Sequence, residues 1–173
     1  MILIGHDGNL FAFDCDQGLV AIRGFDLESK YDKLAYVFPG QGAQHPGMGK
    51  DFYEKFTVAK ETFQEANDLL KRDLMKMVFE GPAETLTETR NSQTGIFVFS
   101  VAILRVLQSQ FPQFKPFCTA GLSLGEYTAL HAANKVTLAD GLRLVEKRGE
   151  LMNTACQRTI GVMSPFLIVS REV

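Results

Sequence analysis

A serine stands in the middle of five residues whose types and spacing suit nucleophilic catalysis. Gly121-Leu122-Ser123-Leu124-Gly125 follows an apolar run and precedes a helix-like run. This G-x-S-x-G pattern is typical of a nucleophile elbow, a sharp strand-to-helix turn that holds the serine oxygen clear of the sheet. Free N–H groups at the start of a helix stabilise the negative charge that develops on a carbonyl under attack. We predict that Ser123 attacks a carbonyl and that the Leu124 N–H donates to the oxyanion.

The pattern by itself occurs by chance in about one chain of this length in twenty, so its context carries the prediction. A glycine-rich loop at 38–44, FPGQGAQ, lies upstream. It can be a plain loop, a phosphate cradle, or a loop that brings a backbone N–H beside the elbow. The phosphate cradle lacks G-x-x-x-x-G-K-[S/T], since Lys50 is followed by Asp51. The oxyanion loop is favoured because the loop directly follows an apolar strand, as in serine hydrolases.

An arginine occupies an apolar position on a helix near the C-terminal end. Gly141, Val145, Arg148 and Met152 share one face at helical spacing. A charge there is costly unless it is paired. In a structural role, Arg148 extends to the rim of the core or pairs with a carboxylate of the protein. In a functional role, it binds the carboxylate of a substrate, which a guanidinium holds with two parallel hydrogen bonds.

The elements that must position these residues alternate between strands and helices. This alternation predicts an α/β fold with a parallel sheet and flanking helices. Thr137-x-x-Asp140 is close to a capping box and opens the last helix. The predicted elements are a hairpin at 9–23, strands at 34–38, 116–121 and 161–169, and helices at 50–71, 74–79, 93–110, 125–133 and 137–156.

The composition excludes several classes of protein. The chain has 173 residues, 46% of them hydrophobic and 22% charged, as in a globular protein with a real core. A net charge of −2 without a basic stripe argues against a nucleic-acid partner. Three cysteines without C-x-x-C argue against a disulfide framework or a zinc site. No signal peptide is visible and the apolar run at 95–104 is short for a membrane span, so we expect a cytoplasmic protein and no membrane partner.

The loop, the elbow and the arginine together resemble the malonyl-CoA:acyl carrier protein transacylase family, whose domains also occur in polyketide and fatty-acid synthases. The resemblance covers about residues 34–173, and order and spacing agree throughout. The shared segments are AYVFPGQGAQ at 35–44, GMG at 47–49, GPAE at 81–84, NSQ at 91–93, GLSLGEY at 121–127 and VEKRGELM at 145–152.

The resemblance implies a role for each site residue. Ser123 would carry the malonyl group as an ester, Gln41 and the Leu124 N–H would form the oxyanion hole, and Arg148 would bind the free carboxylate of the malonyl group. Gln93 would support substrate binding. Malonyl would pass from malonyl-CoA, the substrate, to Ser123 and then to the phosphopantetheine thiol of acyl carrier protein in fatty acid biosynthesis. No metal and no cofactor are implied.

The sequence departs from the family pattern in three places. The elbow has Leu122 where the family usually has histidine, a variation that the family tolerates. Residues 1–33 have no counterpart, so we predict an N-terminal extension at 1–33 before a partial acyltransferase domain at 34–173. Family members are longer, with a ferredoxin-like subdomain and a late catalytic histidine. The chain is therefore expected to end before that subdomain is complete, with its general base beyond Val173.

The three histidines of the chain offer no obvious base. His131 lies eight residues after Ser123 on the same helix, about 12 Å along the axis, which is too far for a hydrogen bond. His6 lies in the extension, and only proximity to the loop favours His45. We expect transfer by the chain alone to be impaired. A serine esterase or thioesterase and a non-catalytic module that binds acyl-CoA or carrier protein are the alternative functions.

Overall fold

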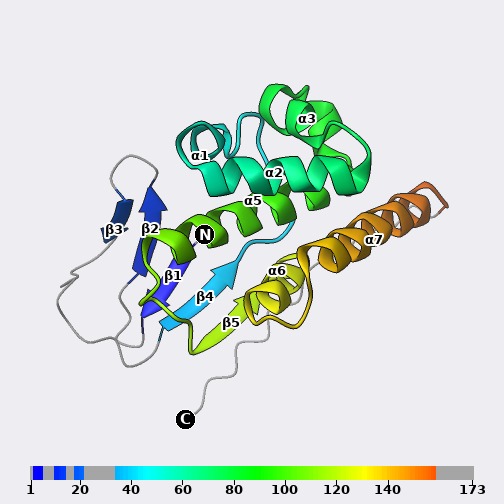
Figure 1. The fold of residues 1–173 in the computed structure, drawn as a ribbon. Coiled ribbons are helices and arrows are strands. Elements are labelled where there is room, and N and C mark those ends of the chain that lie inside the picture. Colours follow the sequence, from blue (N-terminus) through cyan, green and yellow to red (C-terminus); the bar gives the residue numbers. More distant parts are fainter. Residues whose placement is uncertain (1, 6–9, 15–17, 22–33, 159–173) are drawn as a thin grey trace, which may run out of the picture.

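The computed structural model describes residues 2–5, 10–14, 18–21 and 34–158 (Figure 1). The expected strand at 161–169 lies outside the described residues. The elements are β1 (Ile2–Gly5), β2 (Leu10–Asp14), β3 (Gly18–Ala21), β4 (Leu34–Phe38), α1 (Lys50–Lys55), α2 (Thr57–Leu70), α3 (Leu74–Glu80), α4 (Ala83–Thr87), α5 (Thr89–Gln110), β5 (Cys118–Gly121), α6 (Gly125–Ala132) and α7 (Leu138–Arg158).

The described strands form one sheet in the order β3-β2-β1-β4-β5. The parallel pairing that we predicted is present between β4 and β5, with Phe38 opposite Gly121. The predicted hairpin is also present, as the antiparallel pair of β2 and β3. The sheet as a whole is mixed, because the unpredicted strand β1 pairs antiparallel with both β2 and β4. Short connections allow only antiparallel pairing, whereas the long helical crossover from β4 to β5 permits the parallel one.

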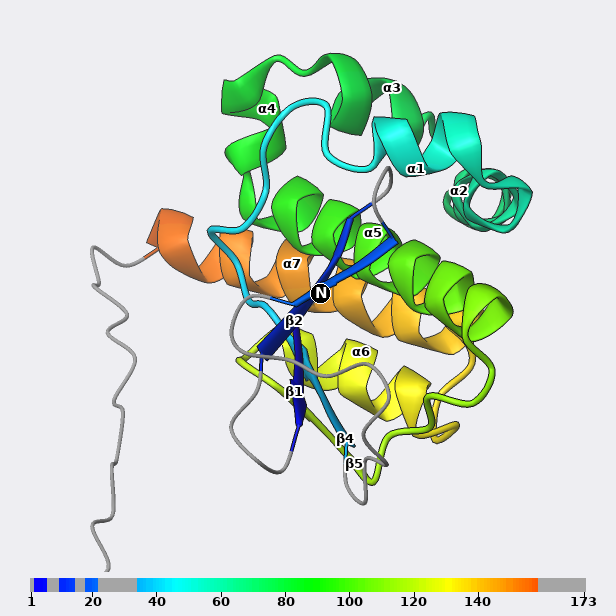
Figure 2. The ribbon, with the colours of Figure 1, turned by 90° about the vertical axis from the view of Figure 1, so that its left-hand side faces the viewer.

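Helix α5 runs through the centre of the described fold. Helices α1 to α3 lie on one side of it, and β4 and α6 lie on the other (Figures 1 and 2). Towards the sheet, Leu104 and Leu107 of α5 pack in one cluster with Tyr36 and Phe38 of β4. The remaining buried face of α5 packs against α2, α3 and α7, including Phe63. The core therefore holds β4, the strand before the glycine-rich loop, against one buried helix.

The single helix predicted over 50–71 is wrong, because the structure has two helices that meet at Phe56. Phe56 is extended, with φ −119° and ψ 119°, and is both the C-cap of α1 and the N-cap of α2. Its ring lies 5.8 Å from that of Phe52, which in turn meets Phe99 of α5 at 6.2 Å. The apolar spacing continues across the break, so only tertiary packing onto α5 determines where the axis turns.

Helix α5 begins at Thr89, four residues before the predicted start at Gln93. Its first turn is polar yet buried, so hydrophobic spacing alone does not reveal it: Asn91 and Ser92 are at most 8% exposed. By length and composition α5 is the one described helix apolar enough to cross a membrane, but 78% of its most apolar window is buried inside the fold. It is a core helix of this domain.

Candidate active site

The predicted elbow is present as a strand–turn–helix. Strand β5 ends at Gly121 and α6 begins at Gly125. Between them Ser123 has φ +54°, in the left-handed region that non-glycine residues seldom adopt. The turn is closed by hydrogen bonds from Leu122 N to the Phe38 oxygen, 3.1 Å, and from Gly125 N to the Leu122 oxygen, 2.9 Å. The backbone strain at Ser123 is thus held by bonds to the neighbouring strand and within the turn.

Two glycines of the elbow leave no room for a side chain. A Cβ at Gly121 would lie 2.0 Å from the carbonyl carbon of Gly125. A Cβ at Gly125 would lie 2.3 Å from the Phe38 oxygen, which also accepts a hydrogen bond from the turn. The G-x-S-x-G spacing is therefore a consequence of backbone packed directly against backbone.

The glycine-rich loop lies against the elbow. A Cβ at Gly40 would be 2.8 Å from the Leu122 oxygen, so the two segments are in backbone contact. The next residue, Gln41, is exposed and reaches toward α5, where its Nε2 lies 3.5 Å from Thr89 Oγ1. The N–H of buried Leu124, at the start of α6, donates to no oxygen of the described residues. The loop and the elbow are thus in direct contact just before α6 begins.

Arg148 of α7 reaches Ser123 directly. Its Nη2 donates to Ser123 Oγ at 2.8 Å, and its Nη1 donates to Gln93 Oε1 at 2.6 Å. The guanidinium carbon also lies 5.9 Å from the ring centre of Tyr127, on α6. The helical face expected from the sequence is present, since Val145 is fully buried and Arg148 half-buried. Arg148 therefore points into the site and not to the rim.

Gln93 links the arginine to the loop. It is fully buried, and its Nε2 donates to Gln41 Oε1 and to Met152 Sδ, both at 3.2 Å. With Arg148 on its carbonyl oxygen, both ends of the Gln93 amide are held. The structure thus brings four of the predicted site side chains into one hydrogen-bonded chain: Gln41, Gln93, Arg148 and Ser123.

The charge of Arg148 has no carboxylate partner in the described part of the chain. Its hydrogen-bond partners there are a neutral amide and a hydroxyl. Other described arginines do pair with carboxylates: Arg90 with Glu146 and Arg105 with Glu65. A half-buried guanidinium with only neutral partners suits an anion brought from outside. Among residues 34–158 and the described strands before them, no group of three or more histidines, cysteines or acids could hold a metal ion.

No described histidine contacts Ser123. The ring of His45 is exposed beside the Pro46 oxygen at 3.2 Å. His131 turns the other way, with Nδ1 3.0 Å from the Val136 oxygen and its ring 6.5 Å from that of Phe97. Within the described residues, the serine hydroxyl is therefore held by an arginine and not by a base.

The partial burial of His131 predicts a pH effect on stability. Burial is the main cause that lowers the pKa of His131 below 6.5, although the bond to Val136 opposes it. The unfolded chain then binds more protons just below pH 6.5, so stability is complete above about pH 6.5 and falls as the pH drops through the folded pKa. Denaturant titration should show that lowering the pH from about 7.5 to about 5.5 reduces the free energy of unfolding more in the wild type than in His131→Asn, whose amide keeps the donor to Val136. Parallel losses in both proteins would contradict this.

Three contacts of the site were not predicted from the sequence. Tyr127 faces Arg148, Met152 accepts from Gln93, and Thr89 lies beside Gln41. Tyr127 lies in the first turn of α6, directly after the elbow that holds Ser123. No sequence signal marks Thr89, because its contact crosses from the loop after β4 to the first turn of α5.

Comparisons with known proteins agree with this geometry. Residues 35–163 match the model of the acyl transferase domain family. The malonyl CoA-acyl carrier protein transacylase of Haemophilus influenzae is 44% identical over 140 residues, which cover 81% of this chain. The solved acyl carrier protein S-malonyltransferase of Vibrio cholerae has a TM-score of 0.67 and 45% identity over 70% of the chain. The solved structure of a type II PKS acyl-carrier protein in complex with its malonyl-transacylase matches with the same TM-score, identity and coverage of this chain.

The similarity extends over only part of each relative. The chain spans 45% of the Haemophilus protein and 39% of each of the two solved chains. The matched range nevertheless covers most of this chain and includes the loop, the elbow and Arg148. On this match, with the elbow and the parallel β4–β5 pair in place, the chain belongs to the acyl transferase domain family.

Proposed function

We propose that this protein transfers a malonyl group from malonyl-CoA to the phosphopantetheine thiol of acyl carrier protein, through an ester on Ser123. The observation that carries the proposal is the contact of Arg148 with Ser123 Oγ at 2.8 Å. It places an unpaired positive charge beside a nucleophile, as an acyl group with a free carboxylate requires. The relatives named as malonyl transacylases, one of them bound to an acyl carrier protein, support the same substrate and partner.

In the proposed reaction, Ser123 Oγ attacks the thioester carbonyl of malonyl-CoA. The O–C bond forms, the C–S bond breaks, and the serine proton passes through a general base to the coenzyme A sulfur. The Leu124 N–H and the Gln41 loop would stabilise the oxyanion of the tetrahedral intermediate. Arg148 would hold the malonyl carboxylate, with Gln93 fixing the guanidinium. In the second half the carrier-protein thiol attacks the ester carbonyl: the C–S bond forms, the C–O bond to Ser123 breaks, and the thiol proton passes through the general base to Ser123 Oγ.

The general base is proposed to lie outside the described residues, since no described histidine contacts Ser123. We propose further that residues 34–173 form the acyltransferase region and 1–33 an extension, that no cofactor takes part, and that the reaction takes place in the cytoplasm. Hydrolysis by an esterase or thioesterase would leave the unpaired Arg148 unexplained.

Labelling with malonyl-CoA tests the proposal. Binding and the oxyanion hole alone retain about 10³–10⁴-fold acceleration over water in serine hydrolases. Long incubation should therefore leave a malonyl ester on the Ser123 peptide, detectable by mass spectrometry, and Ser123→Ala should abolish it. Added acyl carrier protein should remove the label. Tight binding of malonyl-CoA without any adduct would instead support the non-catalytic binding module, and an adduct on another residue would contradict the role of Ser123.

A further inference from the structure

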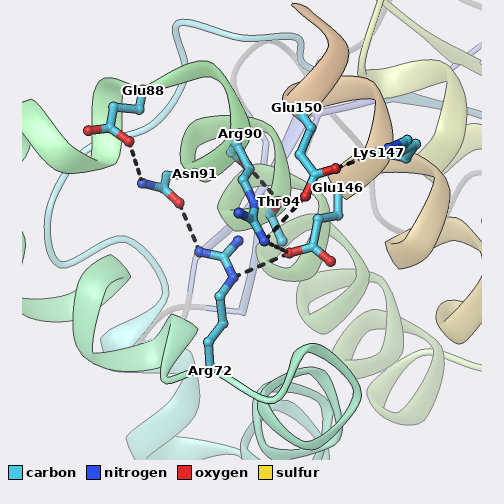
Figure 3. A network of polar contacts seen from close by, with 8 residues as sticks. All are labelled: Arg72, Glu88, Arg90, Asn91, Thr94, Glu146, Lys147 and Glu150. Carbon is cyan, nitrogen blue, oxygen red and sulfur yellow. Dashed lines mark hydrogen bonds and ion pairs between the residues drawn. The ribbon is translucent and has the colours of Figure 1, made fainter. Parts of the chain in front are cut away.

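A network of opposite charges joins α5 and α7 (Figure 3). At its centre Arg90 Nη2 lies 2.6 Å from Glu146 Oε1 and 3.6 Å from Glu150 Oε1. Arg72 adds a second cation on Glu146, at 3.5 Å, and Lys147 a second on Glu150, at 3.4 Å. A third carboxylate, Glu88, is linked to Arg72 through the Asn91 amide, which accepts from Arg72 and donates to Glu88. The members are Arg72, Arg90, Lys147, Glu88, Glu146 and Glu150.

The network and the site are neighbours on the same two helices. Arg90 precedes Gln93 by three residues on α5, and Glu146 and Glu150 stand two residues before and two after Arg148 on α7. One helical turn is about 5.4 Å along the axis. The helices also approach closely here, because a Cβ at Gly149 would lie 2.6 Å from the Cα of Arg90. Residues two apart on a helix point to different sides, so the carboxylates of the network do not touch an anion on Arg148 and act on it only through their longer-range field.

These carboxylates would weaken anion binding if they were left uncompensated. Glu146 is only 21% exposed, so solvent screens its charge poorly. A negative charge near the guanidinium opposes an incoming carboxylate, an effect that falls only as the inverse of distance in a half-buried setting. Arg90 is the nearest counter-charge. Its hydrogen bond to Glu146 is the main cause that raises the pKa of Arg90. The guanidinium of Arg90 thus keeps its positive charge beside the Glu146 carboxylate.

We propose that Arg90, with Arg72, is a specificity-determining residue: it neutralises Glu146 and Glu150, so that the full charge of Arg148 is available to a carboxylated acyl group. Arg90 does not contact the substrate and acts through the electrostatic field at Arg148. The inference rests on the proposed function, because it assigns a role only if Arg148 binds the substrate carboxylate. It adds a second set of residues to the selection of malonyl over neutral acyl groups.

A purely structural role for the same ion pair makes a different prediction. Arg90→Gln and Glu146→Gln both remove the 2.6 Å contact that holds α5 to α7. If the contact only aligned the helices, both variants would lose selectivity for malonyl-CoA. If the charges matter, the variants have opposite effects, because the first leaves a negative charge in excess and the second a positive one. Changes of opposite sign in the preference for malonyl-CoA would therefore show that the charges act electrostatically and not by aligning the helices.

The experiment measures the dissociation constants of malonyl-CoA and acetyl-CoA by calorimetry, in a Ser123→Ala background that prevents acylation. The measured quantity is the ratio of the two constants. Arg90→Gln should lower the preference for malonyl-CoA about five- to tenfold, and Glu146→Gln should raise it about two- to fivefold. Arg143→Gln is the matched control, because Arg143 lies on the same helix in an exposed ion pair with Asp140. It should leave the ratio unchanged.

The outcomes distinguish a failure of the proposed function from a failure of the role proposed for Arg90. A parent protein without preference for malonyl-CoA would overturn the proposed function and this inference with it. A parent with that preference, whose two variants shift the ratio in the same direction or not at all, would overturn only the inference. Circular dichroism checks that each variant is folded. If Arg90→Gln does not fold, a loss of preference in Glu146→Gln still refutes the proposal.

Discussion

Replacing Arg148 with glutamine is expected to weaken malonyl-CoA binding about a hundredfold and to leave acetyl-CoA binding nearly unchanged. Loss of a partly buried, hydrogen-bonded charge pair costs about 3 kcal/mol. Glutamine keeps a donor near Ser123 and Gln93, which are the present partners of Arg148, so the local packing changes little. Only the interaction with a substrate carboxylate is lost in full. Titration of both thioesters with the Ser123→Ala protein measures the effect.

A matched substitution on the same helix separates this effect from general damage. Arg143→Gln removes an equal charge from a side chain that is 74% exposed and paired with Asp140. The Arg143→Gln protein should bind both thioesters as tightly as its parent does, since exposed ion pairs contribute little free energy. Equal loss of malonyl-CoA and acetyl-CoA binding in Arg148→Gln would show that Arg148 supports the fold of the site and not the recognition of a carboxylate.

The second large effect is expected at the elbow, where Gly125→Ala should lower the free energy of unfolding by about 3 kcal/mol. The added Cβ would meet the Phe38 oxygen at 2.3 Å and the Pro39 oxygen at 2.9 Å. Both contacts are backbone, so relief requires β4 and the elbow to separate, and overpacking of this kind is costly. Denaturant titration followed by circular dichroism gives the change in unfolding free energy.

Gly47→Ala provides the comparison for this prediction. Gly47 has φ +87° and no atom within 4 Å of the added Cβ, so the variant reports backbone strain without a clash. A cost of about 1–2 kcal/mol is expected for a left-handed alanine. If Gly47→Ala were as destabilising as Gly125→Ala, close packing of the elbow against β4 would not be the cause.

Local sequence patterns were enough for most of the elements. Apolar runs predicted β4 and the β2–β3 pair, and the Thr137 cap predicted the start of α7, where Thr137 Oγ1 accepts from the Asp140 N–H at 3.1 Å. Their boundaries depend on residues close in sequence. The prediction failed at Phe56, where the helix axis turns to fit α5, and at strand β1, which pairs with the next strand, β2, and with β4 further along the chain.

The sequence by itself identified the residues that could take part in a reaction: a serine between glycines, a glycine-rich loop and an arginine on an apolar helical face. These signals are local, since each is a residue type at a fixed spacing within one turn or one helix. Only the tertiary structure decided that they meet. Gln93 lies 52 residues from Gln41 and 55 from Arg148, and the bonds that join them depend on how α5 packs against α7 and the loop. The same packing decided that Glu146 and Glu150 pair with Arg90, because charge partners across two helices follow from helix contact and not from spacing along one chain segment.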